Sequence, residues 1–412
     1  MVMDDSKRDE PWVSDEFWVS PYNFETNVTN RPEMPDRIRI YDLTLRDGEQ
    51  TPGVVFRKDE KVAIAKLLDE IGVDRIEAGM PVVSGEDQEA IREIAELNLN
   101  AKIYCACNAR ESEIDLALSC GVDGIMVGIP TGYPRIKYEF PNWTEEDTIN
   151  IALKGVSYAK AKGLKVTLFL IDSSRSKKQF LETILSRICK EAPPDAVAIV
   201  DTSGCLIPAA TANNVRFVKQ LTGLPVEIHT HNDLGLGLAN TLAAIEEGAE
   251  VAHVSVNGLG ERGGNVALDE LAIALRCLYG QETMINYHRL TELSKVVEAV
   301  SNIPINRNKP VSGDGIYCRE SGLGIDVVKK APLGIFSLDP EAVGQSSRIV
   351  LGKKSGKKSI EFKVNELGIE GLDKDEQVRE VLGRVKQSSI RNKRLVDDDE
   401  FREIISSVLG NR

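Results

Sequence analysis

Two histidines, His229 and His231, stand one residue apart in the stretch IHTHNDLGLGLAN, and they are half of the four histidines in the 412-residue chain. If this stretch is a β-strand, residues i and i+2 face the same side of it. Both imidazoles can then hold one divalent cation. The spacing alone is weak evidence for a metal site, because such pairs also occur where no metal binds.

A carboxylate and an amide oxygen strengthen the metal interpretation. Asp47 follows a β-branched run at 37–43, and Asn265 follows another at 251–257. If these runs are the first and last strands of a closed barrel, they are neighbours of the histidine strand. Two imidazoles, one carboxylate and one amide suit Zn²⁺, Mn²⁺ or Co²⁺, with Mg²⁺ also possible. A metal with open positions there would polarise a bound carbonyl group.

Eight short β-branched runs alternate with amphipathic helical patterns, and these elements would position the candidate functional side chains. The strands are predicted at 37–43, 74–78, 102–107, 123–128, 165–171, 196–201, 226–231 and 251–257. Between them, KDEKVAIAKLLDEIG at 58–72 has helical spacing and ends in glycine. Eight β–α alternations predict an α/β fold, a (β/α)8 TIM barrel, in which functional residues occupy the carboxyl ends of the strands. The segments TLRDGEQ, DTSG, HTHND and NGLGERGGN stand at such ends.

The chain is expected to divide into three parts. Residues 1–35 are interpreted as an N-terminal arm and 36–285 as the catalytic barrel. Residues 286–412 are interpreted as a linker followed by smaller, mostly helical C-terminal subdomains, with 307–324 as a linker or lid. Within that region DKDEQVREVLGRVKQ predicts a helix whose apolar face carries Val378, Val381, Leu382 and Val385.

Composition excludes several classes of function. A net charge of −13 argues against nucleic-acid or anionic-membrane partners. The first residues lack the apolar core of a secretion signal, and the most apolar stretches are only strand-length. Seven cysteines without a regular framework fit a reducing compartment. These features predict a cytoplasmic enzyme that acts on small molecules.

Two further motifs have competing interpretations. GLGERG at 258–263 satisfies the GxGxxG pattern, but it follows the eighth strand and lacks the downstream acidic partner of a dinucleotide site, so we set that interpretation aside. GKKSGKK at 352–358 is either a loop that contacts phosphate groups, for example those of CoA, or a solvated face, and the solvated face is favoured.

Three segments together carry a family resemblance. DLTLRDGEQTPG, HTHNDLGLGLANTLAAIEEGA and NGLGERGGNVALDEL resemble the metal-dependent acyl-CoA condensing enzymes related to 2-isopropylmalate, homocitrate, citramalate and Re-type citrate synthases. The resemblance implies a 2-oxo acid held on the metal, acetyl-CoA as co-substrate, thioester hydrolysis after condensation, and a homodimer. The segment GERGGN favours the condensing branch over the related lyases.

The same resemblance implies roles for individual residues. Arg46 would stabilise negative charge on the ketone oxygen or the enolate. Gln50 and Thr202 match family positions near the substrate. The alternatives are an ordinary ion pair for Arg46 and a strand-end cap for Thr202.

Three positions depart from the family pattern and put the catalytic base in question. Ile171 stands where the family has a glutamate, although Asp172 beside it is retained. Arg319 and Gly324 stand where the family has histidines, and no histidine follows His288. The candidate bases that remain are Glu320, Glu49 and Asp172, with His253 as a weaker one.

Three interpretations of these departures stay open. The enzyme uses another base for the condensation, catalyses a C–C lyase reaction with the same metal, or only binds a 2-oxo acid. The retained metal set and Arg46 argue against loss of catalysis. A guanidinium matches a carboxylate bidentately, so we expect Arg319 to bind the distal carboxylate of a dicarboxylic oxo acid. That expectation favours citrate or homocitrate as the product.

Overall fold

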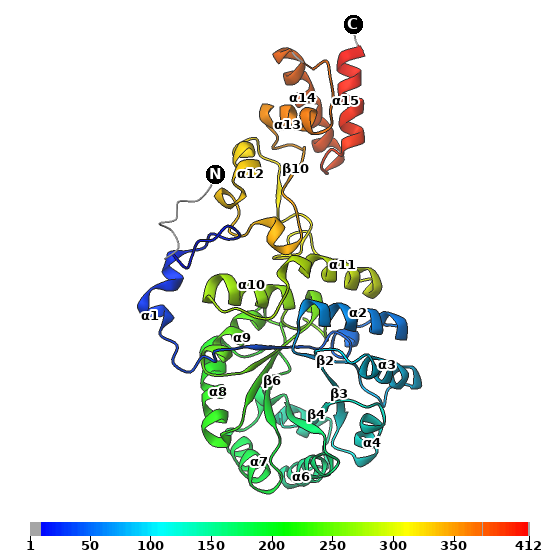
Figure 1. The fold of residues 1–412 in the computed structure, drawn as a ribbon, viewed down its shortest axis with the longest axis vertical. Helices are drawn as coiled ribbons and strands as arrows, with labels where there is room; N and C mark the ends of the chain where they lie inside the picture. Colours follow the sequence, from blue (N-terminus) through cyan, green and yellow to red (C-terminus); the bar gives the residue numbers. More distant parts are fainter. Residues whose placement is uncertain (1–9, 373, 411–412) are drawn as a thin grey trace. The chain divides into compact units, whose positions relative to one another are not determined.

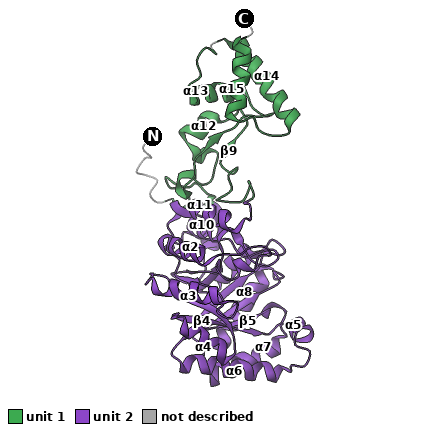
Figure 2. Cartoon of the chain, turned by 90° about the vertical axis from the view of Figure 1, so that its right-hand side faces the viewer, with its two compact units in different colours: residues 1–21, 306–412 green, residues 22–305 purple. Residues whose placement is uncertain are grey.

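The computed structural model describes residues 10–372 and 374–410, which divide into two compact units (Figure 2). One unit spans 22–305. The other combines the described residues up to Pro21 with those from Asn306 onward. The unit at 22–305 is longer at both ends than the predicted barrel domain (36–285). The first nine residues of the predicted arm and the last two of the predicted tail lie outside the described residues.

Eight parallel strands close into a barrel in sequence order, which confirms the predicted (β/α)8 fold. The strands are β1 (Arg39–Asp42), β2 (Arg75–Glu77), β3 (Lys102–Asn108), β4 (Gly124–Pro130), β5 (Lys165–Ile171), β6 (Ala196–Asp201), β7 (Val226–Thr230) and β8 (Val251–Val254). β1 pairs with β8 and β7 pairs with β8, so the strands expected to carry the metal ligands are neighbours.

Helices surround the barrel, as Figure 1 shows. They are α2 (Lys58–Ile71), α3 (Gly85–Glu96), α4 (Glu111–Ser119), α6 (Glu145–Ala161), α7 (Lys178–Glu191), α8 (Pro208–Thr222), α9 (Gly237–Glu246) and α10 (Leu268–Tyr279). The same unit contains α1 (Thr26–Thr29), α5 (Tyr133–Tyr138) and α11 (Leu290–Ser301). No helix within the described ranges combines the length and apolar character needed to cross a bilayer.

Helix α2 shows how the sequence sets these elements. Val62, Ala65 and Leu68 recur at helical spacing and are buried. Gly72 ends the helix with φ of 100°, and its N–H donates to the carbonyl of Leu68. A Cβ at Gly72 would lie 2.2 Å from the backbone oxygen of Met284, so a side chain there would clash as well as strain the backbone.

Apolar and aromatic side chains fill the barrel interior. They are Tyr41, Leu43, Tyr104, Met126, Phe169, Ala198, Val200 and Val251. A charged group is enclosed among them: Glu227 accepts from Arg75 Nη1 at 2.6 Å and lies 2.9 Å from His253 Nε2. A filled interior leaves the strand ends and their loops as the place for a site.

One buried carboxyl group on β1 is poorly compensated. Asp42 is fully buried, and its Oδ1 accepts from the backbone N–H of Thr44 at 2.9 Å. Its Oδ2 has no hydrogen-bond partner among the described residues. Burial raises the pKa of Asp42 to about 7.

Replacing Asp42 by asparagine is expected to stabilise the protein increasingly as pH rises. The pKa of Asp42 is higher in the folded than in the unfolded chain, so its contribution to stability is full below the unfolded value of 3.8 and falls as pH rises toward about 7. Asparagine keeps the acceptor for Thr44 and cannot ionise. Over that range the difference in free energy of unfolding between Asp42→Asn and the wild type should increase, in favour of the variant, by up to ~1.4 kcal/mol per pH unit. Urea unfolding of both proteins across this range measures the difference, and a constant difference would contradict the prediction.

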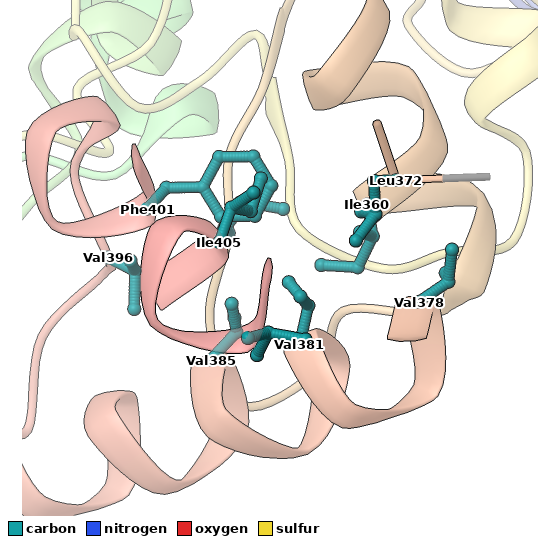
Figure 3. Packing of buried hydrophobic residues seen from close by; sticks show 10 residues of the cluster. Ile360, Leu372, Val378, Val381, Val385, Val396, Phe401 and Ile405 are labelled. Carbon is teal, nitrogen blue, oxygen red and sulfur yellow. The ribbon is translucent and has the colours of Figure 1, made fainter. Parts of the chain in front are cut away.

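The second unit is mostly helical, as expected. It contains α12 (Ile325–Lys330), α13 (Lys357–Glu366), α14 (Asp375–Asn392) and α15 (Asp398–Gly410). Phe401 and Ile405 of α15 lie beside Val381 and Val385 of α14 in one apolar cluster (Figure 3). The predicted helix at 373–387 is therefore confirmed in its described part. Its predicted apolar face is also confirmed, since Val378 is buried and Leu382 packs against the cluster.

A short parallel pair of strands in this unit was not predicted. β9 (Cys318–Arg319) pairs with β10 (Arg348–Ile349), so the segment 307–324 is more than a linker. The N-terminal segment joins the same unit: Trp18 donates to the carbonyl of Ser337 at 2.9 Å, and Phe17 forms a bridge with Leu338. The predicted arm at 1–35 thus divides, with its described part before residue 22 in this unit and the rest in the barrel unit.

Candidate metal centre

Asp47 lies at the end of β1 because the chain turns tightly there. The backbone N–H groups of Arg46 and Gly48 both donate to the carbonyl of Leu43 at 3.1 Å. Asp47 is buried, and its Oδ2 lies 3.5 Å from His229 Nε2 and 3.7 Å from the Nε2 of His231. The turn therefore brings a carboxylate to the two histidines.

The two histidines come from the end of β7. His229 lies on the strand, whereas His231 follows it and bridges to Asn265, one residue beyond the observed strand end. Burial lowers the pKa of His229 well below its ordinary value and also lowers that of His231. Neutral imidazoles do not pair ionically with Asp47 but keep a nitrogen lone pair, which is the form that binds a metal.

Asn265 reaches the same place through a glycine-rich loop. Its Nδ2 donates to the carbonyl of Leu259 at 3.0 Å, which leaves Oδ1 available as a ligand. A Cβ at Gly260 would lie 2.4 Å from Asn265 Nδ2 and 3.2 Å from Asp47 Oδ1. Glycine at 260 thus leaves room for the amide and the carboxylate.

Unpaired buried atoms show that this cluster fits a cation. Four of them have no hydrogen-bond partner among the described residues: Asp47 Oδ1, His229 Nε2, His231 Nδ1 and Asn265 Oδ1. An unsatisfied buried polar group costs about 1–3 kcal/mol, and a cation would satisfy several at once. Ligand atoms of Asp47, His229 and His231 lie within 4.8 Å of one another. The residues present therefore suit a divalent metal.

Arg46 is held beside the cluster by a buried glutamate. Its Nε donates to Glu77 Oε2 at 2.5 Å, and its Nη1 lies 3.3 Å from Asp47 Oδ2. Its Nη2 has no partner among the described residues. Burial raises the pKa of Glu77 to about 7, although the charge of Arg46 opposes the shift. Arg46 is thus a fixed guanidinium with a free donor, not the surface ion pair considered from the sequence.

A cavity of about 260 Å³ joins these groups. Its polar lining includes Arg46, Asp47, Gln50, Asn108, Arg135, Thr202, His229, His231 and Glu261. The apolar part of the cavity wall includes Phe169, Ile171 and Val200. Thr202 lines the cavity and also accepts from the backbone N–H of Asp172 at 2.9 Å, so a capping contact and a substrate contact are compatible.

Two of the predicted bases are held by cations. Asp172 adopts φ of 60°, and its carboxylate accepts from Arg175 Nε at 2.8 and 3.1 Å. It is not among the residues that line the cavity. Glu49 lies 2.5 Å from Lys61 Nζ. Neither carboxylate is presented to the cavity as a free base.

The remaining predicted residues lie elsewhere. His253 is enclosed in the barrel interior with Glu227. Glu320 belongs to the second unit, where it accepts from the backbone N–H of Lys354 at 2.8 Å. Arg319, in the same unit, donates to the backbone carbonyl four residues further on. His253 nevertheless packs against the metal cluster, since its ring centroid is 5.6 Å from that of His229, but its Nε2 lies 2.9 Å from Glu227 and it does not line the cavity.

Sequence reasoning missed Glu77 and Arg135. Glu77 ends β2, so the feature that could have indicated it was an acidic residue at the carboxyl end of a barrel strand. Arg135 lies on α5, which follows β4 directly, so its signal was position after a strand end. Its Nη1 lies 3.1 Å from Glu139 Oε2 on the same helix.

The fold and the cluster define a class of (β/α)8 barrel enzymes with two histidines and a carboxylate grouped at the strand ends. Residues 37–297 match the HMGL-like family, and residues 311–393 match the homocitrate synthase post-HMGL domain. The chain therefore belongs to the HMGL-like family, in its branch of homocitrate, 2-isopropylmalate and citramalate synthases, as the motif resemblance predicted.

Two relatives and one solved structure illustrate this placement. A homocitrate synthase of Methanopyrus kandleri is 41% identical over 95% of this chain and 97% of its own length. A 2-isopropylmalate synthase of Methanocaldococcus jannaschii is 40% identical over 92% of this chain and 73% of its own length. The crystal structure of an HMG-CoA lyase from Brucella melitensis superposes with a TM-score of 0.58, at 21% identity, over 65% of this chain and all of that chain. The last comparison supports the fold alone.

Proposed function

We propose that the chain catalyses a metal-dependent condensation of acetyl-CoA with a dicarboxylic 2-oxo acid, followed by thioester hydrolysis. The product would be homocitrate or citrate. One observation carries this proposal: the metal-type cluster, Arg46 and Arg135 line the same cavity. Membership of a synthase family supports the condensation, and the homocitrate synthase relative supports a dicarboxylic substrate.

Asn265 and the polar residues that line the cavity can divide the steps of this reaction among them. Asp47, His229, His231 and Asn265 would hold a divalent ion, which when bound would polarise the ketone of the oxo acid. Arg46 would donate through its free Nη2 to oxygen that gains negative charge during attack, and Glu77 would keep that guanidinium in place. Gln50 and Thr202 would contact the substrate from the cavity lining.

Arg135 is a second candidate for the role that the sequence suggested for Arg319. It lines the cavity of the metal cluster. Its partner Glu139 is about half exposed, and such helical ion pairs contribute little. The guanidinium can therefore exchange that partner for the distal carboxylate of a substrate, with a bidentate geometry that favours carboxylates.

The base that removes the α-proton is proposed from the acids that remain. Glu261 lines the cavity and lies 2.8 Å from Arg262. It joins Glu320 as a candidate because it lines the cavity, whereas Asp172, Glu49 and His253 do not.

A thiol-release assay tests the proposed reaction. Purified protein with Mn²⁺ or Zn²⁺ is given acetyl-CoA and, in turn, oxaloacetate, 2-oxoglutarate, pyruvate or 2-oxoisovalerate. CoA release with one of the first two is the expected result. Absence of CoA release with all four would overturn the proposal, and cleavage of a hydroxy acid or its CoA ester instead would establish the lyase alternative.

Replacing Arg135 by methionine is expected to lower kcat/KM for the dicarboxylic oxo acid by roughly 10²-fold. The variant keeps the length of the side chain and removes the charge that the distal carboxylate would meet. Steady-state kinetics with a dicarboxylic and a monocarboxylic oxo acid measure the effect.

Lys137→Met on the same helix is the matched control, because Lys137 does not line the cavity. This control variant should leave kcat/KM unchanged for both substrates. An equal loss for both substrates in Arg135→Met would contradict a role in recognising the distal carboxylate.

A further inference from the structure

The basic run at 352–358 divides into two halves with different surroundings. Lys357 pairs with Asp375, and Lys358 lies 2.6 Å from the carboxylate of Asp326. Lys353, by contrast, has no ion-pair partner among the described residues. The second half of the run is therefore neutralised. In the first half Lys354 lies 3.4 Å from Glu320, so the uncompensated charge is that of Lys353.

The first half lines a cavity of about 480 Å³ in the C-terminal unit, here called the basic cavity. Its charged lining consists of Arg307, Lys353, Lys354, Lys393 and Arg394, with Glu320 as the acid. These residues come from three separate parts of the chain, which the fold of the unit brings together. Five bases around one cavity contrast with the net charge of −13 of the whole chain.

Ion pairs account for part of this concentration of charge, but Lys353 and Lys393 have no ion-pair partner among the described residues. Lys393 follows the last turn of α14, where a cation is favourable, but this explains one base of the five. Arg307 lies 3.2 Å from Asp314, and Arg394 lies 3.1 Å from Asp397. The pair of Arg307 is solvent-exposed and contributes little, so this guanidinium can turn to a ligand. Arg394 also lies 2.8 Å from Glu400, which is only 19% exposed, so it is held in place at the edge of the cavity. Like charges around a cavity repel each other, and a bound anion would relieve that repulsion.

We propose that the basic cavity binds the phosphate groups of an adenine nucleotide, either the nucleotide part of CoA or a free nucleotide. Ammonium and guanidinium groups are the usual ligands of phosphate oxygens. Ile390, which is 56% exposed, and Leu395 add apolar lining against which a base ring can pack. For CoA this inference rests on the proposed reaction, which uses acetyl-CoA; for a free nucleotide it goes beyond that reaction.

Calorimetric titration of the full, metal-free chain at low ionic strength tests the proposal. The probes are adenosine 3′,5′-bisphosphate, ADP, CoA and inorganic phosphate. The double variant Lys353→Gln with Lys393→Gln removes two charges of the cavity, and Lys357→Gln with Lys358→Gln removes two charges from the paired half of the same run. We expect the first double variant to weaken nucleotide binding about tenfold or more and the second to leave it within about twofold.

Each outcome has a defined meaning. Binding of the bisphosphate and CoA without ADP would identify the cavity as a site for CoA, whereas binding of ADP as well would identify a site for free nucleotides. Absence of saturable nucleotide binding, equal weakening in both double variants, or inorganic phosphate bound as tightly as the nucleotides would overturn the proposal. These titrations need no turnover, so their failure is distinguishable from failure of the thiol-release assay.

Discussion

Arg46→Lys is expected to lower kcat/KM of the condensation by roughly 10²–10³-fold while metal binding is retained. Arg46 uses Nε on Glu77 and Nη1 on Asp47, and this leaves Nη2 for the substrate. A lysine ammonium has the charge but not the planar fork, so it cannot hold both carboxylates and still present a donor at the same point. The loss should therefore fall mainly on kcat.

Steady-state kinetics together with titration of the metal separates this role from a structural one. Glu77→Gln should give a smaller loss than Arg46→Lys, because glutamine still accepts a hydrogen bond from Nε but does not fix the charge. Arg57→Lys serves as a control at an exposed arginine of the same unit. A variant at Arg46 that lost the metal, or that raised KM alone, would contradict the assigned role.

His229→Gln is expected to weaken binding of the divalent metal by more than about 10²-fold and to remove nearly all activity. Loss of a direct ligand should exceed the 10–100-fold that loss of an outer partner costs. Glutamine preserves much of the volume and so limits damage to the buried site. Titration of the metal-free protein with Mn²⁺ or Zn²⁺ measures the affinity without any need for turnover.

Two companion variants make the result specific. His288→Gln removes an exposed histidine far along the chain from the cluster and should bind the metal as the wild type does. Asn265→Ala should weaken binding of the metal less than His229→Gln does, since it removes one neutral oxygen ligand. Unchanged affinity in His229→Gln would show that the cluster of Asp47, His229 and His231 is not the metal site.

The barrel was predictable because its signals are local. Buried β-branched runs set each strand to within a few residues, and glycine after helices such as α2 marks where they end. The pairing of β9 with β10 was not predictable, since two residues at 318–319 meet two at 348–349 and neither pair has a pattern of its own. Pairing at such a distance depends on tertiary packing, which outweighs local preference.

The site shows the same division between local and non-local information. His229, His231, Asp47 and Asn265 were found because strand ends of a barrel must meet. Glu77 and Arg135 were missed because their roles depend on contacts across strands and loops. The ion pair of Asp172, a predicted base, with Arg175 was not predictable either, since it depends on a left-handed backbone conformation at Asp172.

The pairing of residues 16–18 with 337–339 has a consequence for synthesis of the protein on the ribosome. The barrel unit can complete its contacts once residue 305 has emerged, because both of its ends lie within that stretch. Residues 16–18, which include Phe17 and Trp18, cannot pair until residues 337–339 have been made, more than three hundred residues after them. Between the synthesis of residue 305 and that of residue 339, the nascent chain can therefore carry a folded barrel unit together with an unpaired aromatic segment, and a chaperone would protect that segment from aggregation.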